Sequence, residues 1–196
     1  MPKRTWKIRR CNTPQQRGLR EFALSIPEER RDLLVEVGSF IGESAYILSQ
    51  YFRRVVCVDP WLPGPMKKFG EGLGITCWSQ AEGIFDRNNR DIPSIIKIRG
   101  VDLDVAPLFA PASIDVLYLD HEHTYEACIA SFQAWLDKIK PEGYYCGHDY
   151  NFIPVREACL HWMGEPEQTF RDYSWLYSKA TIVRRRATLQ HRRDER

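Results

Sequence analysis

Short apolar runs alternate along this chain with longer segments of helical periodicity. The apolar runs predict strands at Leu33–Val37, Val55–Val58, Ile95–Ile98, Ile114–Leu119 and Tyr144–Gly147. The segments between and around them predict helices at Pro14–Arg31, Glu43–Tyr51, Trp78–Asn89, Tyr125–Lys140 and Val155–Met163. Such alternation is typical of an α/β fold, in which helices cover both faces of a mostly parallel sheet. Phe170–Tyr177 and Ala180–Arg185 predict a closing antiparallel pair, which brings the expected sheet to seven strands.

The first predicted strand runs into a loop that contains two glycines. Glu36 precedes Gly38, Gly42 follows after three residues, and a helical pattern begins at Glu43. A glycine has no Cβ, so the backbone of such a loop can approach a ligand closely. The second strand ends in Asp59, where a carboxylate is placed to accept hydrogen bonds from a ribose diol. The two features together predict a nucleoside-containing cofactor.

The spacing of the glycines bears on which cofactor this is. A dinucleotide fingerprint has three glycines, and the middle one makes room for the pyrophosphate on a helix N-terminus. Phe40 occupies that middle position here and would crowd a pyrophosphate. This position of Phe40 disfavours a nicotinamide-dependent oxidoreductase, which is kept as the first alternative.

Composition fits one soluble domain over residues 1–196, with 43% hydrophobic residues and a net charge of +2. The ends, 1–12 and 187–196, are basic, but no nucleic-acid recognition motif accompanies their arginines, so we do not expect nucleic-acid binding. The six cysteines form no Cys-x-x-Cys pair, which disfavours structural zinc. No signal-peptide core and no bilayer-length apolar run occur, so we expect a cytoplasmic protein without a membrane partner.

Two later predicted strands are each followed directly by a cluster of carboxylate and imidazole side chains. Asp120, His121 and His123 follow the fourth strand, and His148-Asp149 follow the fifth. Polar residues at the carboxyl ends of such strands gather in one crevice, at the point where the strand order reverses. Carboxylate oxygens suit Mg²⁺ or a similar divalent cation, whereas a more His-rich geometry would suit Zn²⁺ or Fe(II). The sequence predicts a metal site and leaves the metal open.

The combined motifs carry a resemblance to a known family. Glu36-Val37-Gly38-x-x-x-Gly42-x-Ser44, Asp59-Pro60, Asp120-x-x-His123-x-Tyr125-Glu126 and Gly147-His148-Asp149-Tyr150 resemble the class I S-adenosylmethionine (SAM) methyltransferases that include the macrocin and mycinamicin O-methyltransferases, with catechol O-methyltransferases as relatives. The resemblance covers about Leu33 to Tyr150. It implies a Rossmann-like fold, SAM as methyl donor, a divalent cation such as Mg²⁺, and a small polar acceptor such as a sugar or diol.

The resemblance also assigns roles to residues. It implies that Asp120 and Asp149 bind the metal and that His123 is the base. His148 stands where some metal-dependent relatives have a further ligand, which makes it the third candidate. The candidate cofactor-binding residues are Glu36, Gly38, Ser39, Gly42, Asp59, Gly100, Asp102, Asp120 and His121, with Asp102 expected at the adenine amino group and His121 in the adenosine pocket.

A second alternative comes from a different class of protein. It is a chain with the SAM-binding fold that binds its ligand without chemistry, or that binds nucleic acid through its basic ends. The acidic and histidine residues at positions 120, 123 and 149 disfavour it. The sequence does not predict the oligomeric state or the identity of the acceptor.

Overall fold

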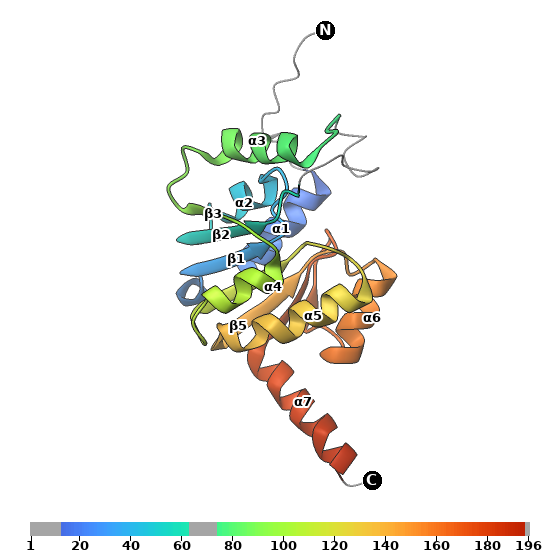
Figure 1. The fold of residues 1–196 in the computed structure, drawn as a ribbon. Helices are drawn as coiled ribbons and strands as arrows, with labels where there is room; N and C mark the ends of the chain where they lie inside the picture. Colours follow the sequence, from blue (N-terminus) through green and yellow to red (C-terminus); the bar gives the residue numbers. More distant parts are fainter. Residues whose placement is uncertain (1–12, 63–73, 195–196) are drawn as a thin grey trace.

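One mixed sheet organises the computed structural model of the chain, which describes residues 13–62 and 74–194 (Figure 1). In this described part the sheet has seven strands in the order β3-β2-β1-β4-β5-β7-β6. The first five strands pair in parallel, and β7 runs antiparallel to both β5 and β6. The strands are β1 (Leu33–Val37), β2 (Arg54–Asp59), β3 (Ile95–Arg99), β4 (Ile114–Leu119), β5 (Ile139–Gly147), β6 (Gln168–Thr169) and β7 (Trp175–Ser178).

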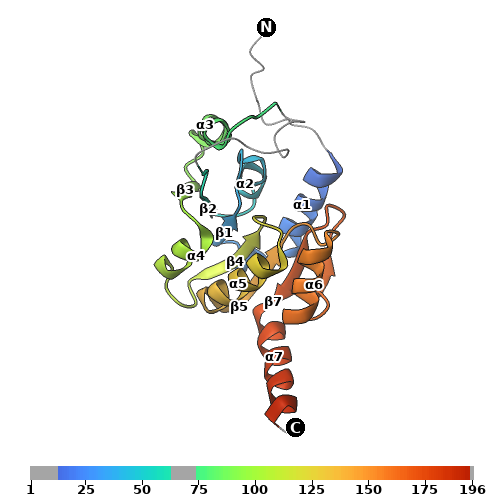
Figure 2. The ribbon, with the colours of Figure 1, turned by 45° about the vertical axis from the view of Figure 1, so that its right-hand side comes forward.

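Helices cover both faces of this sheet, as the sequence predicts (Figures 1 and 2). On one face lie α1 (Pro14–Ser25), α2 (Glu43–Leu48) and α3 (Trp78–Asn89). On the other lie α4 (Asp102–Val105), α5 (Tyr125–Trp135) and α6 (Ile153–Trp162). The chain ends in α7 (Lys179–Asp194), which starts against the body and then extends away from it (Figure 2). In the described ranges, none of the helices has the length and apolar character needed to cross a membrane.

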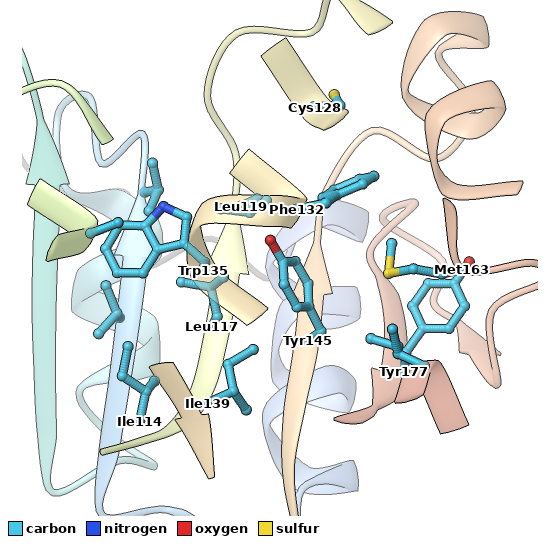
Figure 3. Close-up of a cluster of buried hydrophobic side chains, with 14 of the residues drawn as sticks. Ile114, Leu117, Leu119, Cys128, Phe132, Trp135, Ile139, Tyr145, Met163 and Tyr177 are labelled. Atoms are coloured by element: carbon cyan, nitrogen blue, oxygen red, sulfur yellow. The ribbon is translucent and has the colours of Figure 1, made fainter. Parts of the chain in front are cut away.

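Successive side chains on the central strands point to opposite faces of the sheet and pack into two separate hydrophobic cores. On β1, Leu34 packs with α1 to α3, whereas its neighbour Val35 packs with α5 and α6. Figure 3 shows the second core, where the ring of Phe132 on α5 lies 5.6 Å from those of Tyr145 and Trp162. Removing a buried ring of this kind typically costs about 3–5 kcal/mol. The two-sided burial explains why the central strands are apolar on both faces.

Three predicted boundaries are wrong, each for a local reason. The first helix stops at Ser25 because Ile26 precedes Pro27, and a residue before proline is disfavoured in the helical region. The predicted Tyr125–Lys140 helix ends at Trp135, followed by a single 3-10 turn, and β5 already begins at Ile139. A shift in register with β4 accommodates the Pro-containing start of that strand.

The predicted strand at Ala180–Arg185 is also wrong, because this segment is the first part of α7. The closing antiparallel hairpin exists, but β6 and β7 form it. Arg185 donates hydrogen bonds to the carbonyls of Met163 and Glu165, just beyond α6, and Arg186 lies over the Trp162 ring. These contacts need the helical spacing and bring the arginines to the end of α6, where carbonyls lack helical partners.

The strand order reverses between β1 and β4, and this reversal positions the site. The last residues of the two strands, Val37 and Leu119, are paired neighbours in the sheet. The amide of Asp120 donates to the carbonyl of Val37 at 2.7 Å, so the loop after β1 and the segment after β4 start side by side. Ligands of open α/β sheets bind at such a reversal, beyond the carboxyl ends of the strands.

Two helical glycines provide a matched test of packing. A Cβ on Gly18 in α1 would lie 2.5 Å from the carboxyl carbon of Asp172, a buried side chain, whereas a Cβ on Gly83 in α3 would meet only Arg87, at 3.5 Å. We expect Gly18→Ala to lower the free energy of unfolding by about 1–3 kcal/mol through overpacking. Gly83→Ala should raise it by about 0.5–1 kcal/mol through helix propensity. Urea unfolding measures both, and an equal gain in the two variants would contradict the packing described for Gly18.

Candidate functional site

The end of β1 holds a buried acid whose carboxylate lacks a partner with good hydrogen-bond geometry. Glu36 is fully buried at the end of the strand, and neither of its carboxylate oxygens makes a hydrogen bond within residues 13–62 and 74–194. The buried hydroxyl of Ser39 lies close enough to the Glu36 carboxylate to lower its pKa, but it also lacks a partner with hydrogen-bond geometry. Burial raises the pKa of Glu36 to about 7. Because buried polar groups are rarely left unsatisfied, these atoms mark a place for a polar or cationic ligand group.

Asp59 holds this loop against the chain that follows β2. Its Oδ2 accepts from the amide of Phe40 at 2.9 Å, and its Oδ1 accepts from the amide of Trp61 at 2.8 Å. The Trp61 indole in turn donates to the carbonyl of Phe40 at 2.8 Å. Burial raises the pKa of Asp59, while the two backbone amides oppose that rise. The carboxylate therefore orders the loop, and each of its oxygens keeps a lone pair beyond the one that accepts from a backbone amide.

The glycines of this loop have a reason that the sequence reasoning missed. Gly38 and Gly42 have φ values of +92° and +76°, which L side chains rarely adopt. A Cβ on Gly38 would lie 1.9 Å from the carbonyl oxygen of Asp120, and one on Gly42 would lie 2.1 Å from the Asn89 amide nitrogen. A Cβ on Gly100 would meet Val105 at 2.6 Å. These glycines therefore permit the loops to pack against neighbouring segments, and the predicted contact of Gly38, Gly42 and Gly100 with a cofactor stays a prediction.

The predicted adenosine-side residues Asp102 and His121 are brought together by a third residue. Ser131, buried on α5, donates its hydroxyl proton to Oδ2 of Asp102 at 2.5 Å. Its oxygen lies 2.6 Å from Nε2 of His121 and must accept there, because its only proton is already used. Burial lowers the pKa of His121, which favours the neutral ring with its proton on Nε2. Ser131 had no motif to mark it; its one signal was a small polar residue on the buried side of an otherwise apolar helix.

A charged cluster lies beyond the ends of β4 and β5. Ligand atoms of Asp120, His123 and Asp149 all lie within 4.8 Å of one another. Nε2 of His123 is 2.7 Å from Oδ2 of Asp149 and 3.7 Å from Oδ1 of Asp120. It meets neither oxygen with hydrogen-bond geometry, so both contacts are ion pairs. Nδ1 of His148 is 3.2 Å from Oδ1 of Asp149 and 3.8 Å from Oδ1 of Asp120.

The charges of the cluster compensate one another. The carboxylates of Asp120 and Asp149 raise the pKa of His123 to about 9. Burial opposes the charged form of His148, yet the same two carboxylates raise its pKa to about 9. The two imidazoles hold the pKa of Asp149 well below its ordinary value. Near neutral pH both imidazoles are therefore protonated beside the Asp149 carboxylate.

Asp149 reaches this cluster through an unusual backbone turn. Its φ is +58°, and the amide of Phe152 closes the turn by donating to its carbonyl at 2.8 Å. The Phe152 ring then meets the His123 ring edge-on, with centroids 5.9 Å apart. A non-glycine residue held in this region is uncommon and is often found at functional sites.

Comparisons with known proteins agree with this geometry. A family model described as a methyltransferase domain matches residues 35–150, from the glycine loop to the residue after Asp149. A search of curated protein sequences finds no match.

Solved structures share the fold at low sequence identity. A Corynebacterium glutamicum protein aligns with a TM-score of 0.56 and 13% identity, over 87% of this chain and 82% of its own. The O-methyltransferase NovP aligns with a TM-score of 0.55 and 16% identity, over 84% and 77%. The cofactor-bound protein Rv0187 from MTB aligns with a TM-score of 0.53 and 18% identity, over 86% and 81%.

Some similar structures are longer than this chain, which covers 49% of the YcgJ protein from Bacillus subtilis. The family match spans more than half of the present sequence and includes most of β1, the strands β2 to β5, the glycine loop and the charged cluster. This chain belongs to that family of methyltransferase domains.

Proposed function

We propose that this chain is a SAM-dependent O-methyltransferase that acts on a small hydroxylated molecule with help from a divalent cation. The observation that carries the proposal is a pair of neighbouring features at the strand reversal. One is the fully buried carboxylate of Glu36 at the end of β1, beside the glycine loop, and the other is the Asp120–His123–Asp149 cluster. NovP, which shares the fold, is an O-methyltransferase.

The residues around the glycine loop fit SAM chemically. The unpaired oxygens of Glu36 and Ser39 suit the ammonium of the amino-acid end of SAM, and Asp59 suits the ribose diol. Asp102 and neutral His121 offer acceptor atoms, which suit the two N–H donors of the adenine amino group.

The same loop disfavours the nicotinamide alternative. The first turn of α2 carries Glu43, whose carboxylate accepts from Gln16 at 2.6 Å. A carboxylate at this helix N-terminus repels a pyrophosphate, which would otherwise bind there. With Phe40 in the middle of the loop as well, the arrangement suits a cofactor without phosphates.

The cluster fits a divalent cation and a base. Asp120 and Asp149 would supply oxygen ligands, His148 is a third candidate, and a bound cation would lower the pKa of an acceptor hydroxyl. Asp120 and Asp149 lie against the imidazole of His123, which in its neutral form would accept the proton of the acceptor hydroxyl. The residues thereby align and activate the acceptor, which is the main need of an in-line methyl transfer.

Asp59→Asn tests the cofactor side. The amide keeps the size of the carboxylate but removes its charge and one acceptor atom, so SAM should bind about 1.5–3 kcal/mol more weakly. Isothermal titration with SAM measures this. Asp32→Asn is the matched control, because Asp32 pairs with Arg54 at the opposite end of the same strands. Unchanged SAM affinity in a folded Asp59→Asn protein would remove Asp59 from the cofactor site.

Asp120→Asn and Asp149→Asn test the metal side. Each variant should lose Mn²⁺ binding and methyl transfer, because a neutral amide is a poor ligand for a hard cation, while SAM still binds. Calorimetric titration with Mn²⁺ and with SAM separates the two effects, and Asp104→Asn, an exposed acid on α4, is the control. EDTA should suppress turnover of the wild type, and Mg²⁺ should restore it. Full turnover in EDTA would reject metal assistance.

The cluster also predicts a pH dependence for the metal-free protein. His123 and His148 have folded pKa values near 9, above their unfolded value near 6.5. Their stabilising contribution is complete below pH 6.5 and is lost as pH rises through 9. Because these side chains are partly exposed, we expect a loss of about 1–3 kcal/mol in unfolding free energy between pH 6.5 and 9.5.

Urea unfolding of the EDTA-treated protein at several pH values measures this loss. His123→Gln should flatten the dependence, whereas His161→Gln, an exposed change outside the cluster, should leave it unchanged. A stability that is flat from pH 6.5 to 9.5 in the wild type would contradict the acid–imidazolium pairing.

A further inference from the structure

The last helix carries a set of basic residues that no acidic residue interrupts. α7 contains Lys179, Arg184-Arg185-Arg186 and Arg192-Arg193, and Asp194 at its end is its first carboxylate. The sequence predicts a strand over part of this segment, whereas the structure makes it one helix of 16 residues. The charges are therefore gathered along a single element. A high density of one charge on such an element indicates a partner of the opposite charge.

The first half of α7 is fixed to the body of the molecule, and the second half projects from it. Ile182 is buried, and the contacts of Arg185 and Arg186 tie the helix to the end of α6. Ala187 and Thr188, which follow, are exposed, and the helix continues away from the body to its last residue (Figures 1 and 2). At a rise of about 1.5 Å per residue, residues 187–194 form a projection of about 12 Å.

The projection starts from the edge of the sheet that lies opposite the proposed site. Nζ of Lys179 donates to the carbonyl of Ile139, the first residue of β5, at 2.5 Å. The charged cluster lies beyond the last residue of the same strand. Arg184, just before the projection, is exposed and donates to the hydroxyl of Thr181 at 3.3 Å, a contact that leaves its charge uncompensated. A partner bound to α7 would therefore meet free positive charge and leave the site open.

The composition of α7 discriminates between negatively charged partners. A helix that lies on an anionic membrane needs an apolar face, but besides buried Ile182 this helix has only Val183 and Leu189 as large apolar residues. Single-stranded nucleic acids stack their bases on aromatic side chains, and residues 179–194 include no Phe, Tyr or Trp. The composition therefore favours a duplex, which is bound through its phosphates.

The shape of the projection favours DNA over RNA. An α-helix with its side chains is about 10–12 Å across, and the major groove of B-form DNA is about 12 Å wide and about 8.5 Å deep. The projection of about 12 Å is long enough to enter it. The major groove of an A-form RNA duplex is too narrow for side chains to enter. A single helix that extends from a globular body thus matches the geometry of a DNA groove.

We propose that α7 docks in the major groove of a DNA duplex and holds the protein there through the phosphate backbone. Arg184 and the two arginines of the projection supply the charges, because a guanidinium binds phosphate oxygens with two parallel hydrogen bonds. Contacts to phosphates carry no sequence information, so the docking is independent of base sequence. This inference does not rest on the proposed function, and it replaces the expectation from composition that the basic ends bind no nucleic acid.

Fluorescence anisotropy of the full chain with an end-labelled DNA duplex of about 20 base pairs tests the docking. Three arginine–phosphate contacts give a log–log slope of about −2.7 against salt concentration. The dissociation constant should therefore rise about 40-fold between about 50 and 200 mM salt. The RNA duplex and the single strand of the same sequence, and phosphatidylserine vesicles at equal phosphate concentration, should each bind more weakly than the DNA duplex.

Two triple variants with the same change in net charge locate the contact. Glutamine keeps helix propensity and removes the charge. The first variant combines Arg184→Gln, Arg192→Gln and Arg193→Gln, and it should bind the duplex at least about tenfold more weakly with a nearly flat salt dependence. The control combines three exposed arginines of α1 and α3, as Arg17→Gln, Arg87→Gln and Arg90→Gln, and it should bind within about twofold of the wild type. Urea unfolding checks that both variants are folded.

Each other result would overturn the docking. Failure of the wild type to bind the DNA duplex at low salt would do so, as would binding of RNA, single strand or vesicles as tightly as the DNA duplex. A loss of affinity in the control as large as that in the α7 variant would show a contact elsewhere on the surface. Full affinity in a folded α7 variant would remove this helix from any such contact.

Discussion

The parallel pairing of β1 with β4 is the constraint on which the site depends. It sets Val37 opposite Leu119, so that the glycine loop and the acidic segment leave the sheet at neighbouring points. The approach is so close that Gly38 has no room for a Cβ against the Asp120 carbonyl. A slip of one residue would turn Glu36 to the opposite face and place its carboxylate in the wrong core. The register thus joins the proposed methyl donor site to the proposed acceptor site.

The two halves of the proposed site differ in how their charged groups are compensated. On the donor side, burial raises the pKa of Glu36 more than the nearby hydroxyls of Ser39 and Ser44 lower it, so the protein carries an unfavourable group that a cationic ligand would stabilise. On the acceptor side, Asp149 is balanced by His123 and His148 within hydrogen-bonding or ion-pair distance. A cation that enters there must displace protons from the imidazoles, which couples its binding to pH.

Part of this arrangement could be predicted from the sequence because strand ends in parallel sheets converge. Glu36, Asp59, Asp120 and Asp149 each follow or end an apolar run, and the structure places all four at one edge. A polar residue inside a helix does not stand at the end of an apolar run, so the sequence pattern did not mark such residues. Ser131 joins Asp102 to His121 only because α5 packs against α4, a tertiary contact that no local pattern encodes.

Long-range packing also explains what the local pattern does not. The sequence predicts that the loop glycines allow a ligand to approach, and the structure shows in addition that Asp120 and Asn89 from distant segments pack where a Cβ would stand. Ala180–Arg185 has adjacent apolar residues that favour a strand, but hydrogen bonds from Arg185 to the end of α6 accompany a helix. In both cases long-range packing decides between local possibilities that the sequence leaves nearly equal.

Backbone strain offers a last link between the two halves of the site. Among the described residues, five non-glycine positions have a positive φ, and four of them lie on the carboxyl edge of the sheet: Phe40, Trp61, Asp149 and Tyr173. The first two are held by Asp59, and the second two are joined through the Tyr150 amide. Each such residue costs roughly 1–3 kcal/mol, so it persists only where surrounding contacts enforce it. Because these strained positions are concentrated at one edge, the contacts that enforce them also fix the backbone at the edge where the proposed site lies.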